Sequence, residues 1–297
     1  MKVAAFHASR CLSEADLGPE RVGCLWCGSA DVRPVVPVQA EPEVTLRRCR
    51  SCAAASVSNL PTPEALDHYY GSYYRGDADH AVTMDDPTRL AARIAGYAPP
   101  ERHLRVLDLG GGDGTISAEV LRVRRAAGEV TVVDYDHRRT ALAPPGVTIA
   151  HLTDLADLPG DAVFDLVLAS AVLEHLPEPA PVLTGLLQRV APGGTIYARA
   201  PYVEPFLAVA RRLGMTINFT FPAHLSDLGP AFWDGLGAWV PEVRRFEVLA
   251  SRPSPVETSL RQRPARTLVA AAAKAPWHLV KGWPFVGGWE WAARAIR

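Results

Sequence analysis

The sequence predicts an α/β protein whose mostly parallel, seven-stranded sheet carries helices on both faces. Between residues 104 and 200, short runs rich in Val and Leu alternate with segments of helical length. Such alternation is typical of doubly wound parallel sheets with crossover helices. A glycine-rich turn at 110–114 follows the first of these strands, and two Cys-x2-Cys pairs precede the domain. We therefore expect a doubly wound sheet with a small metal-binding unit before it.

Length and composition are those of an ordinary globular protein. The 297 residues suit one large domain with an appendage. The net charge of −1 provides no overall attraction to nucleic acid or anionic membrane, although residues 251–297 hold eight Lys/Arg against two Asp/Glu. No apolar run approaches the ~20 residues of a membrane span. The N-terminus lacks the continuous apolar core of a secretory signal, so a cytoplasmic location is expected.

Residues 1–60 are expected to form a zinc ribbon. Four of the five cysteines form two Cys-x2-Cys pairs separated by 21 residues, which suits tetrahedral zinc. Two disulfides are the competing interpretation, but nothing indicates an oxidising compartment. A zinc held by four thiolates has no open position for water, so it is expected to be structural. The four predicted ligands are Cys24, Cys27, Cys49 and Cys52, which leaves Cys11 as a free thiol.

Residues 61–100 are expected to link the ribbon to the main domain. A helix begins near Pro63 and leads into four tyrosines within six residues, at 69–74. These rings predict either a clasp over the mouth of a site or packing between ribbon and domain. A second helix is expected at 87–98.

The main domain, residues 101–275, is expected to supply the sheet. The glycine turn and the Pro192-Gly193-Gly194 turn mark two of its boundaries. The predicted elements, in order, are strand 104–109, helix 115–126, strand 129–134, short helix 137–142, strand 147–151, strand 163–169, helix 178–190, strand 194–200, and late strands at about 245–250 and 266–273. The tail, 276–297, is basic and rich in Trp, and we expect it to pack on the domain or to act as a lid.

The glycine turn predicts a site for a nucleotide-like cofactor. Glycines at 110, 112 and 114 allow backbone conformations closed to other residues, and the helix that follows directs free N–H groups toward a ligand. The third glycine comes one residue too early for a dinucleotide fingerprint, which weighs against a nicotinamide oxidoreductase. Asp108 lies in the preceding strand, and Asp134 ends the next strand, 24 positions after Gly110, where a carboxylate suits ribose hydroxyls.

With these motifs, residues from about 100 to 275 resemble the class I S-adenosylmethionine-dependent methyltransferases, a Rossmann-like family. The resemblance implies that the glycine turn holds the methionyl part of the cofactor and that Asp134 binds its ribose. It also implies that Tyr135 and Asp154 lie beside the adenine. The cofactor-binding residues expected are Asp108, Gly110, Gly112, Asp134, Tyr135, Asp154, Leu155 and Ser170. A ribbon before such a domain is similar to the arrangement in deoxysugar C-methyltransferases.

Methyl transfer from a sulfonium requires alignment, and a general base helps when the acceptor is a hydroxyl or a carbon acid. His175 follows the fourth strand, and His224 lies after the fifth, so both are candidate bases. The alternative is that His175 only shapes the pocket. Arginines at 261, 263 and 266 would suit a phosphorylated substrate such as a nucleotide-linked sugar, although a solvated loop is the commoner explanation for such a cluster.

Three functions remain open at this point. The first is methyl transfer to a small molecule, most plausibly a sugar or a natural-product intermediate. The second is an RNA methyltransferase, which the near-neutral charge disfavours. The third is a non-catalytic binding module, against which the intact glycine turn and Asp134 argue. The acceptor atom and the oligomeric state stay undetermined.

Overall fold

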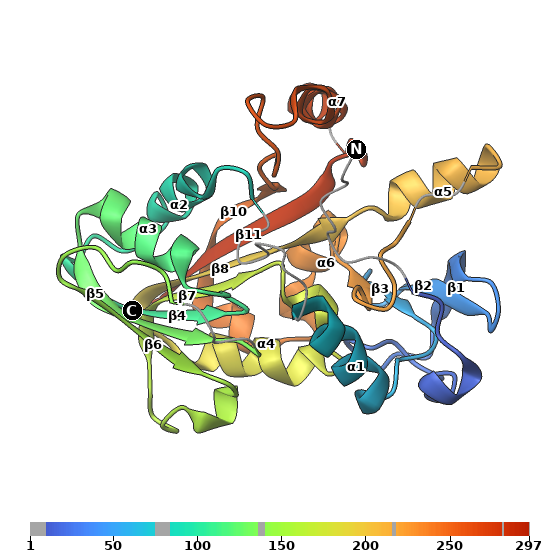
Figure 1. Ribbon diagram of the computed structural model, residues 1–297, viewed down its shortest axis with the longest axis horizontal. Helices are drawn as coiled ribbons and strands as arrows, with labels where there is room; N and C mark the ends of the chain where they lie inside the picture. The colour runs from blue at the N-terminus through green and yellow to red at the C-terminus, as the bar shows by residue number, and fades with distance from the viewer. Residues whose placement is uncertain (1–9, 75–83, 136–139, 216–217, 281, 297) are drawn as a thin grey trace.

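The structure is a computed structural model that describes residues 10–74, 84–135, 140–215, 218–280 and 282–296 (Figure 1). The strands are β1 Val32–Gln39, β2 Val44–Cys49, β3 Ala55–Val57, β4 His103–Leu109, β5 Ala127–Val133, β6 Val147–Leu152, β7 Phe164–Ser170, β8 Val190–Tyr202, β9 Ser226–Asp227, β10 Phe246–Pro253 and β11 Gly287–Ala295. The helices are α1 Pro63–Tyr74, α2 Pro87–Ala95, α3 Thr115–Arg124, α4 Pro179–Gln188, α5 Glu204–Arg212, α6 Pro230–Asp234 and α7 Pro264–Lys274. Two short 3-10 turns that matter below are η3 Leu173–His175 and η6 Ala275–His278.

The large sheet has seven strands in the order β10-β11-β8-β7-β4-β5-β6. The strands from β8 to β6 run parallel, whereas β11 is antiparallel to both β8 and β10. The chain enters the sheet at β4, moves outward to β6 and then returns to β7 on the other side of β4. The order therefore reverses between β4 and β7, the position where ligands of doubly wound sheets bind. The predicted fold class is confirmed.

Helices cover both faces of this sheet, as Figure 1 shows for α2 and α3 on one side and α4 on the other. Successive strand residues point to opposite faces, so Val106 and Leu107 of β4 enter different cores. Val106 packs in one buried cluster with Leu90 of α2 and Leu121 of α3. Leu107 belongs to the other cluster, which includes Leu186 of α4. The alternation of β and α segments thus produces two hydrophobic layers around one sheet.

A second, antiparallel sheet joins the N-terminal unit to the main domain. Its order is β1-β2-β3-β9, and β9 comes from the loop region after α5. Ser226 and Asp227 of β9 pair with Ser56 and Ala55 of β3. The larger buried cluster is continuous across this junction, because it contains Trp26 of the N-terminal unit together with residues of the main domain. The ribbon unit therefore shares one core with the domain that follows it.

The late part of the chain differs from the sequence prediction. The strand predicted at about 245–250 is present as β10. The prediction of a strand at 266–273 is wrong, because these residues lie in α7. Pro264 occupies the first turn of α7, where a missing N–H costs nothing, and the alanines at 270–273 favour a helix. The seventh strand is β11, within the tail, and its Trp289 and Trp291 are buried. The tail is thus part of the sheet.

Two further predictions concern a short helix and the membrane. The short helix predicted at 137–142 falls mostly outside the described residues, and 140–142, within them, are not helical. None of the helices in the described part of the chain is long and apolar enough to cross a membrane.

Candidate active site and metal centre

The glycine turn connects β4 to α3 with the tight geometry expected from its sequence. Gly110 has φ of +67°, and a Cβ there would lie 2.6 Å from Cγ2 of Val172. Only glycine tolerates both the left-handed conformation and that approach. Asp113, through its Oδ1, accepts the Thr115 N–H at 2.9 Å and so caps α3. The acid that caps the helix is therefore Asp113, and Asp108 is free for another role.

Asp108 lies beneath this turn with its carboxyl group buried. A Cβ at Gly111 would be 2.4 Å from Asp108 Cγ, so the carboxyl packs directly on the loop backbone. Oδ2 of Asp108 has no hydrogen-bond partner among the described residues. Burial raises the pKa of Asp108 to about 7. A buried carboxylate oxygen of this kind calls for a donor, which the cationic amino group of S-adenosylmethionine would supply.

The predicted ribose and adenine residues stand at the ends of β5 and β6. Asp134 accepts the Gly112 N–H through Oδ2 at 2.8 Å, so the acid after β5 is tied directly to the glycine turn. Tyr135, next to it, exposes 61% of its surface. Asp154 follows β6 and accepts the Ala156 N–H at 2.8 Å, which opens a short turn containing the partly buried Leu155. These residues lie at the carboxyl edge of the sheet, where the prediction requires them.

Ser170, at the end of β7, is held by a buried arginine. Its Oγ accepts a hydrogen bond from Arg199 Nε at 3.1 Å. Arg199 also donates to Glu257 Oε1 at 2.7 Å, which links β8 to the segment after β10. The structure therefore gives Ser170 an anchoring contact inside the protein, and its contact with a cofactor stays a prediction.

His175 and His224 come together, although 48 residues separate them in the sequence. Their ring centroids are 4.9 Å apart. Nδ1 of His175 lies 2.8 Å from the carbonyl oxygen of Ala223, and a carbonyl can only accept, so Nδ1 carries the proton. Burial, and then His224, lower the pKa of His175 to about 3. The ring is therefore neutral at physiological pH, with the lone pair on Nε2.

This pair adjoins the glycine turn. Val172, whose side chain packs against Gly110, immediately precedes η3, and η3 ends at His175. Leu225, after His224, donates its N–H to the Glu174 carbonyl at 2.7 Å and thereby fixes the second histidine loop on η3. The cofactor residues and the candidate bases thus share one edge of the sheet.

Glu174, between Val172 and the histidines, has a buried carboxyl group. Burial raises its pKa to about 8, so the neutral acid predominates near pH 7. Its Oε1 lies 3.8 Å from His175 Nε2. This arrangement suits an orienting or structural role for Glu174.

Tyr70 is the site residue that the sequence indicated only as part of a tyrosine cluster. Its hydroxyl lies 3.3 Å from His175 Nδ1, which brings α1 to the histidine pair. Tyr69, its neighbour, is 4% exposed and contacts the Tyr70 ring at 5.3 Å. Tyr69 is therefore buried and Tyr70 lies beside the histidine pair, and a tyrosine clasp over the site stays a prediction. The side chains of Tyr73 and Tyr74 lie outside the described residues.

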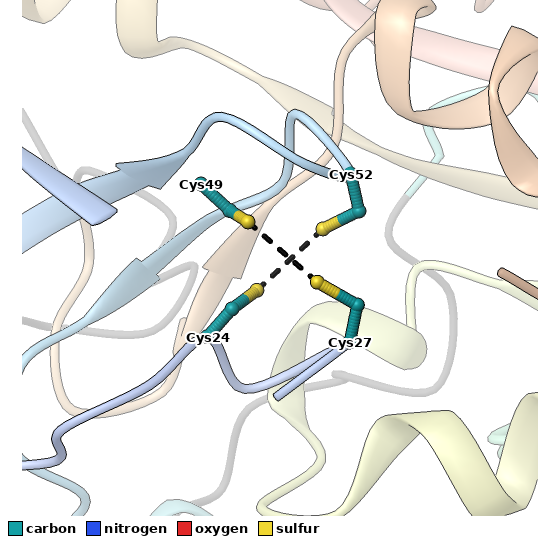
Figure 2. Close-up of side chains that lie close together, drawn as sticks. All are labelled: Cys24, Cys27, Cys49 and Cys52. Carbon is teal, nitrogen blue, oxygen red and sulfur yellow. Dashed lines mark hydrogen bonds between the residues drawn. The ribbon is translucent and has the colours of Figure 1, made fainter. Parts of the chain in front are cut away.

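Figure 2 shows the four cysteines of the N-terminal unit pointing at one centre. Sγ of Cys24 lies 3.5 Å from that of Cys52, Sγ of Cys27 lies 3.6 Å from that of Cys49, and all four are within 4.8 Å of one another. Zinc–sulfur bonds of about 2.3 Å in a tetrahedron place sulfur atoms about 3.8 Å apart. All four cysteines are free, so the disulfide interpretation is wrong for this structure.

Each cysteine pair sits in the same local turn. Gly28 donates its N–H to the Cys24 carbonyl, and Ala53 donates to that of Cys49. Both residues have positive φ, +74° and +61° respectively. A left-handed residue after the second cysteine folds the chain so that both thiols face inward. The donor set therefore fits a tetrahedral zinc ion.

Comparison with known proteins identifies a methyltransferase domain in this chain. A family model described as a methyltransferase domain matches residues 79–232. Trans-aconitate 2-methyltransferase of Methylobacterium nodulans is 34% identical over 141 residues, covering 46% of this chain and 54% of that protein. Ubiquinone biosynthesis O-methyltransferase of Xanthomonas campestris is 31% identical over 129 residues, covering 38% and 48%. The chain thus spans about half the length of these relatives.

Solved structures with a similar fold include an S-adenosylmethionine-dependent methyltransferase from Mesorhizobium loti. It is 21% identical, covers 71% of this chain and 98% of its own, and has a TM-score of 0.47. The 1,6-didemethyltoxoflavin-N1-methyltransferase of Burkholderia thailandensis is 16% identical, covers 82% and 95%, and has a TM-score of 0.45.

The match to the family model carries the classification. It runs from the segment before α2 into α6 and so includes the glycine turn, Asp134 and both histidines. Because this match covers just over half of the 297 residues, the chain belongs to the family of proteins with a methyltransferase domain.

Proposed function

We propose that the protein transfers a methyl group from S-adenosylmethionine to a small acceptor, most plausibly a sugar or a natural-product intermediate. One observation carries this proposal. The Asp134–Gly112 contact and the His175–His224 pair lie at the same edge of the sheet, connected through Val172 and Gly110. A cofactor site and a pair of candidate bases are thereby adjacent.

The chain offers a partner for each part of the cofactor. Asp108 and the backbone of Gly110 and Gly112 would hold its methionyl end, and Asp134 would bind its ribose. Tyr135, Asp154 and Leu155 would surround the adenine, with Ser170 at the rim. When bound, S-adenosylmethionine would supply a methyl group activated by its sulfonium sulfur.

The histidine pair favours an acceptor that has a proton to lose. The neutral His175 presents the lone pair of Nε2, and His224 lies against its ring. A hydroxyl or carbon acid benefits from a base, and His175 can serve as one once a bound ligand raises its pKa from about 3 toward neutral pH. The carboxylates of trans-aconitate, after which several relatives are named, are already ionised near neutral pH and need none. A hydroxyl or an acidic carbon is therefore the preferred acceptor group.

We also propose that the four cysteines bind structural zinc. Their sulfur atoms have the spacing of a tetrahedral site, and four thiolates would leave no position for a substrate. The ion would hold the ribbon, and through the β3–β9 pairing it would support the loop that carries His224.

The test combines native mass spectrometry with methyl transfer assays. We expect one zinc and one S-adenosylmethionine per chain, and methylation within a panel of nucleotide-linked sugars and hydroxylated natural products. His175→Ala should lower kcat by about 10²–10⁴-fold and leave cofactor affinity unchanged. His103→Ala, at an exposed position on β4, is the matched control.

Three results would contradict the proposals separately. Failure to bind S-adenosylmethionine would remove the enzyme function. Binding without transfer to any acceptor would favour a non-catalytic module. Normal kcat in His175→Ala would remove the base and leave the acceptor open to groups that need none.

A further inference from the structure

An exposed apolar surface lies on α7 and the turn that follows it, outside both sheets (Figure 1). Helix α7 buries only Thr267. The large apolar side chains exposed on this segment are Leu268 (60%), Val269 (71%), Leu279 (90%) and Val280 (50%), and Leu260, just before α7, is 59% exposed. A helix packed only on the protein would direct such residues inward. This segment therefore presents apolar side chains to its surroundings.

Helix α5 carries further exposed apolar side chains. Leu213 and Met215, at its C-terminal end, are 68% and 60% exposed. A row of aromatic rings connects the two helices. Phe206 of α5 contacts Phe285 at 5.2 Å, and Phe285 contacts Trp283 at 5.3 Å. Trp283 in turn donates Nε1–H to the Ala273 carbonyl of α7 at 2.7 Å. These contacts link α7 to the start of α5, and we call the exposed side chains of the two segments together the α5–α7 surface.

The exposed charges of this surface are positive, because Glu204, the acid at the start of α5, is buried and paired with Arg48. Residues 205–226 and 258–289 contain seven Lys/Arg and no Asp/Glu. Arg212, Arg261 and Arg266 are exposed. Two of the seven cations turn inward instead, since Arg263 pairs with Asp85 at 3.7 Å and Lys274 donates to the Ser254 carbonyl at 2.6 Å. The exposed Arg212, Arg261 and Arg266 are neighbours in the sequence of the exposed Leu213, Leu260 and Leu268.

We propose that the α5–α7 surface docks the protein on an anionic lipid bilayer. Apolar side chains bordered by arginines match the boundary between acyl chains and acidic headgroups. A second copy of the chain would bring the same positive charges together, which disfavours self-association through this surface. The bilayer therefore fits both the apolar and the electrostatic character of the surface, and the docking does not depend on the methyl transfer proposed above.

Vesicle co-sedimentation of the full chain tests this proposal. We expect sedimentation with phosphatidylcholine vesicles that contain phosphatidylglycerol, weaker sedimentation with phosphatidylcholine alone, and loss of binding as salt rises. The double variant Leu268→Asp/Val269→Asp should bind at least about tenfold more weakly, because each buried Leu or Val contributes more than 1 kcal/mol. Arg261→Gln/Arg266→Gln should reduce binding only to the anionic vesicles.

The matched control is Val22→Asp, at an 85% exposed position in the N-terminal unit. It should bind like the wild type, and thermal melting should show that all variants are folded. Absence of wild-type binding to either vesicle would overturn the proposal, as would equal binding by Leu268→Asp/Val269→Asp. Dimers in sedimentation velocity that this variant abolishes, without vesicle binding, would identify a second copy as the occupant instead.

Discussion

Asp108 illustrates how a residue predicted to bind a cofactor can oppose folding. Its carboxyl group is buried under the glycine turn, and burial raises its pKa to about 7. The folded state therefore holds a proton that the unfolded chain releases above pH ~4. The contribution of Asp108 to the free energy of unfolding is fully present below that pH. It is lost as the pH rises to about 7. Asp108 thus stands at a position where, without a ligand, its charge is unfavourable.

We predict that Asp108→Asn is more stable than the wild type near pH 7 and that the difference shrinks toward pH 4. Each pKa unit corresponds to about 1.4 kcal/mol, so the gain would be at most about 4 kcal/mol. The same variant should bind S-adenosylmethionine more weakly, because it lacks the carboxylate. Chemical denaturation across this pH range and calorimetric titration measure the two effects. A stability difference independent of pH would contradict the assignment of the ionised state.

Gly111 offers a second test at the residue scale. A Cβ there would stand 2.4 Å from Asp108 Cγ, so Gly111→Ala must displace the carboxyl or the turn. We expect a loss of about 1–3 kcal/mol in stability and a reduction of at least about tenfold in cofactor affinity. Gly160→Ala is the control, because a Cβ there meets no atom within 4 Å. Unchanged affinity in Gly111→Ala would mean that the cofactor does not use this turn.

At the scale of elements, the cysteine unit is expected to govern stability. Cys52 is 3% exposed, and β3, which follows it, pairs with β9 of the main domain. Loss of a structural metal is among the few changes that cost more than about 4 kcal/mol, which corresponds to a fall of roughly 8–16 °C in Tm.

Cys52→Ser should therefore lower Tm by that amount and abolish the zinc mass in a native spectrum. Cys11→Ser should change neither, because Cys11 is exposed and only donates Sγ–H to the Glu41 carbonyl. If the wild type and Cys52→Ser have the same Tm as each other, both in metal-free buffer and with added zinc, the cysteines hold no structural ion.

The elements that the sequence predicted well are those whose pattern is local. The glycine turn, the parallel strands and the cysteine pairs each need only neighbouring residues to be recognised. The run at 266–273 failed because a short apolar run suits a strand or a helix equally, and the deciding signal was Pro264 before it.

Strand β11 could not be recognised because its partners are remote. Glu290 is fully buried in the sheet, where a lone charge would be prohibitive. Its carboxylate accepts from Arg93 at 2.7 Å, from Arg252 at 2.8 Å and from Tyr197 at 3.0 Å, and these come from three separate elements. The contact of Tyr70 with His175 is likewise set by tertiary structure, across 105 residues.

At the scale of the whole molecule, the ribbon and the methyltransferase domain behave as one folding unit. Trp26, between Cys24 and Cys27, is 3% exposed. Its ring lies 4.7 Å from that of Phe232, and its Nε1 donates to Ser226 Oγ at 3.0 Å. A side chain of the N-terminal unit is thus buried within the domain that carries the candidate site, so neither part has a complete core alone.

We therefore predict a single calorimetric transition for the zinc-loaded protein, with equal calorimetric and van't Hoff enthalpies. Trp26→Ala removes about 3–5 kcal/mol and should lower that one transition by roughly 6–20 °C without splitting it. Val22→Ala, nearby but exposed, should leave Tm unchanged. Two resolved transitions, with Trp26→Ala moving only the first, would show that the ribbon unfolds independently. In that case loss of zinc would leave the pairing of His175 with His224 intact. With a shared core, loss of zinc would instead disrupt that pairing as well.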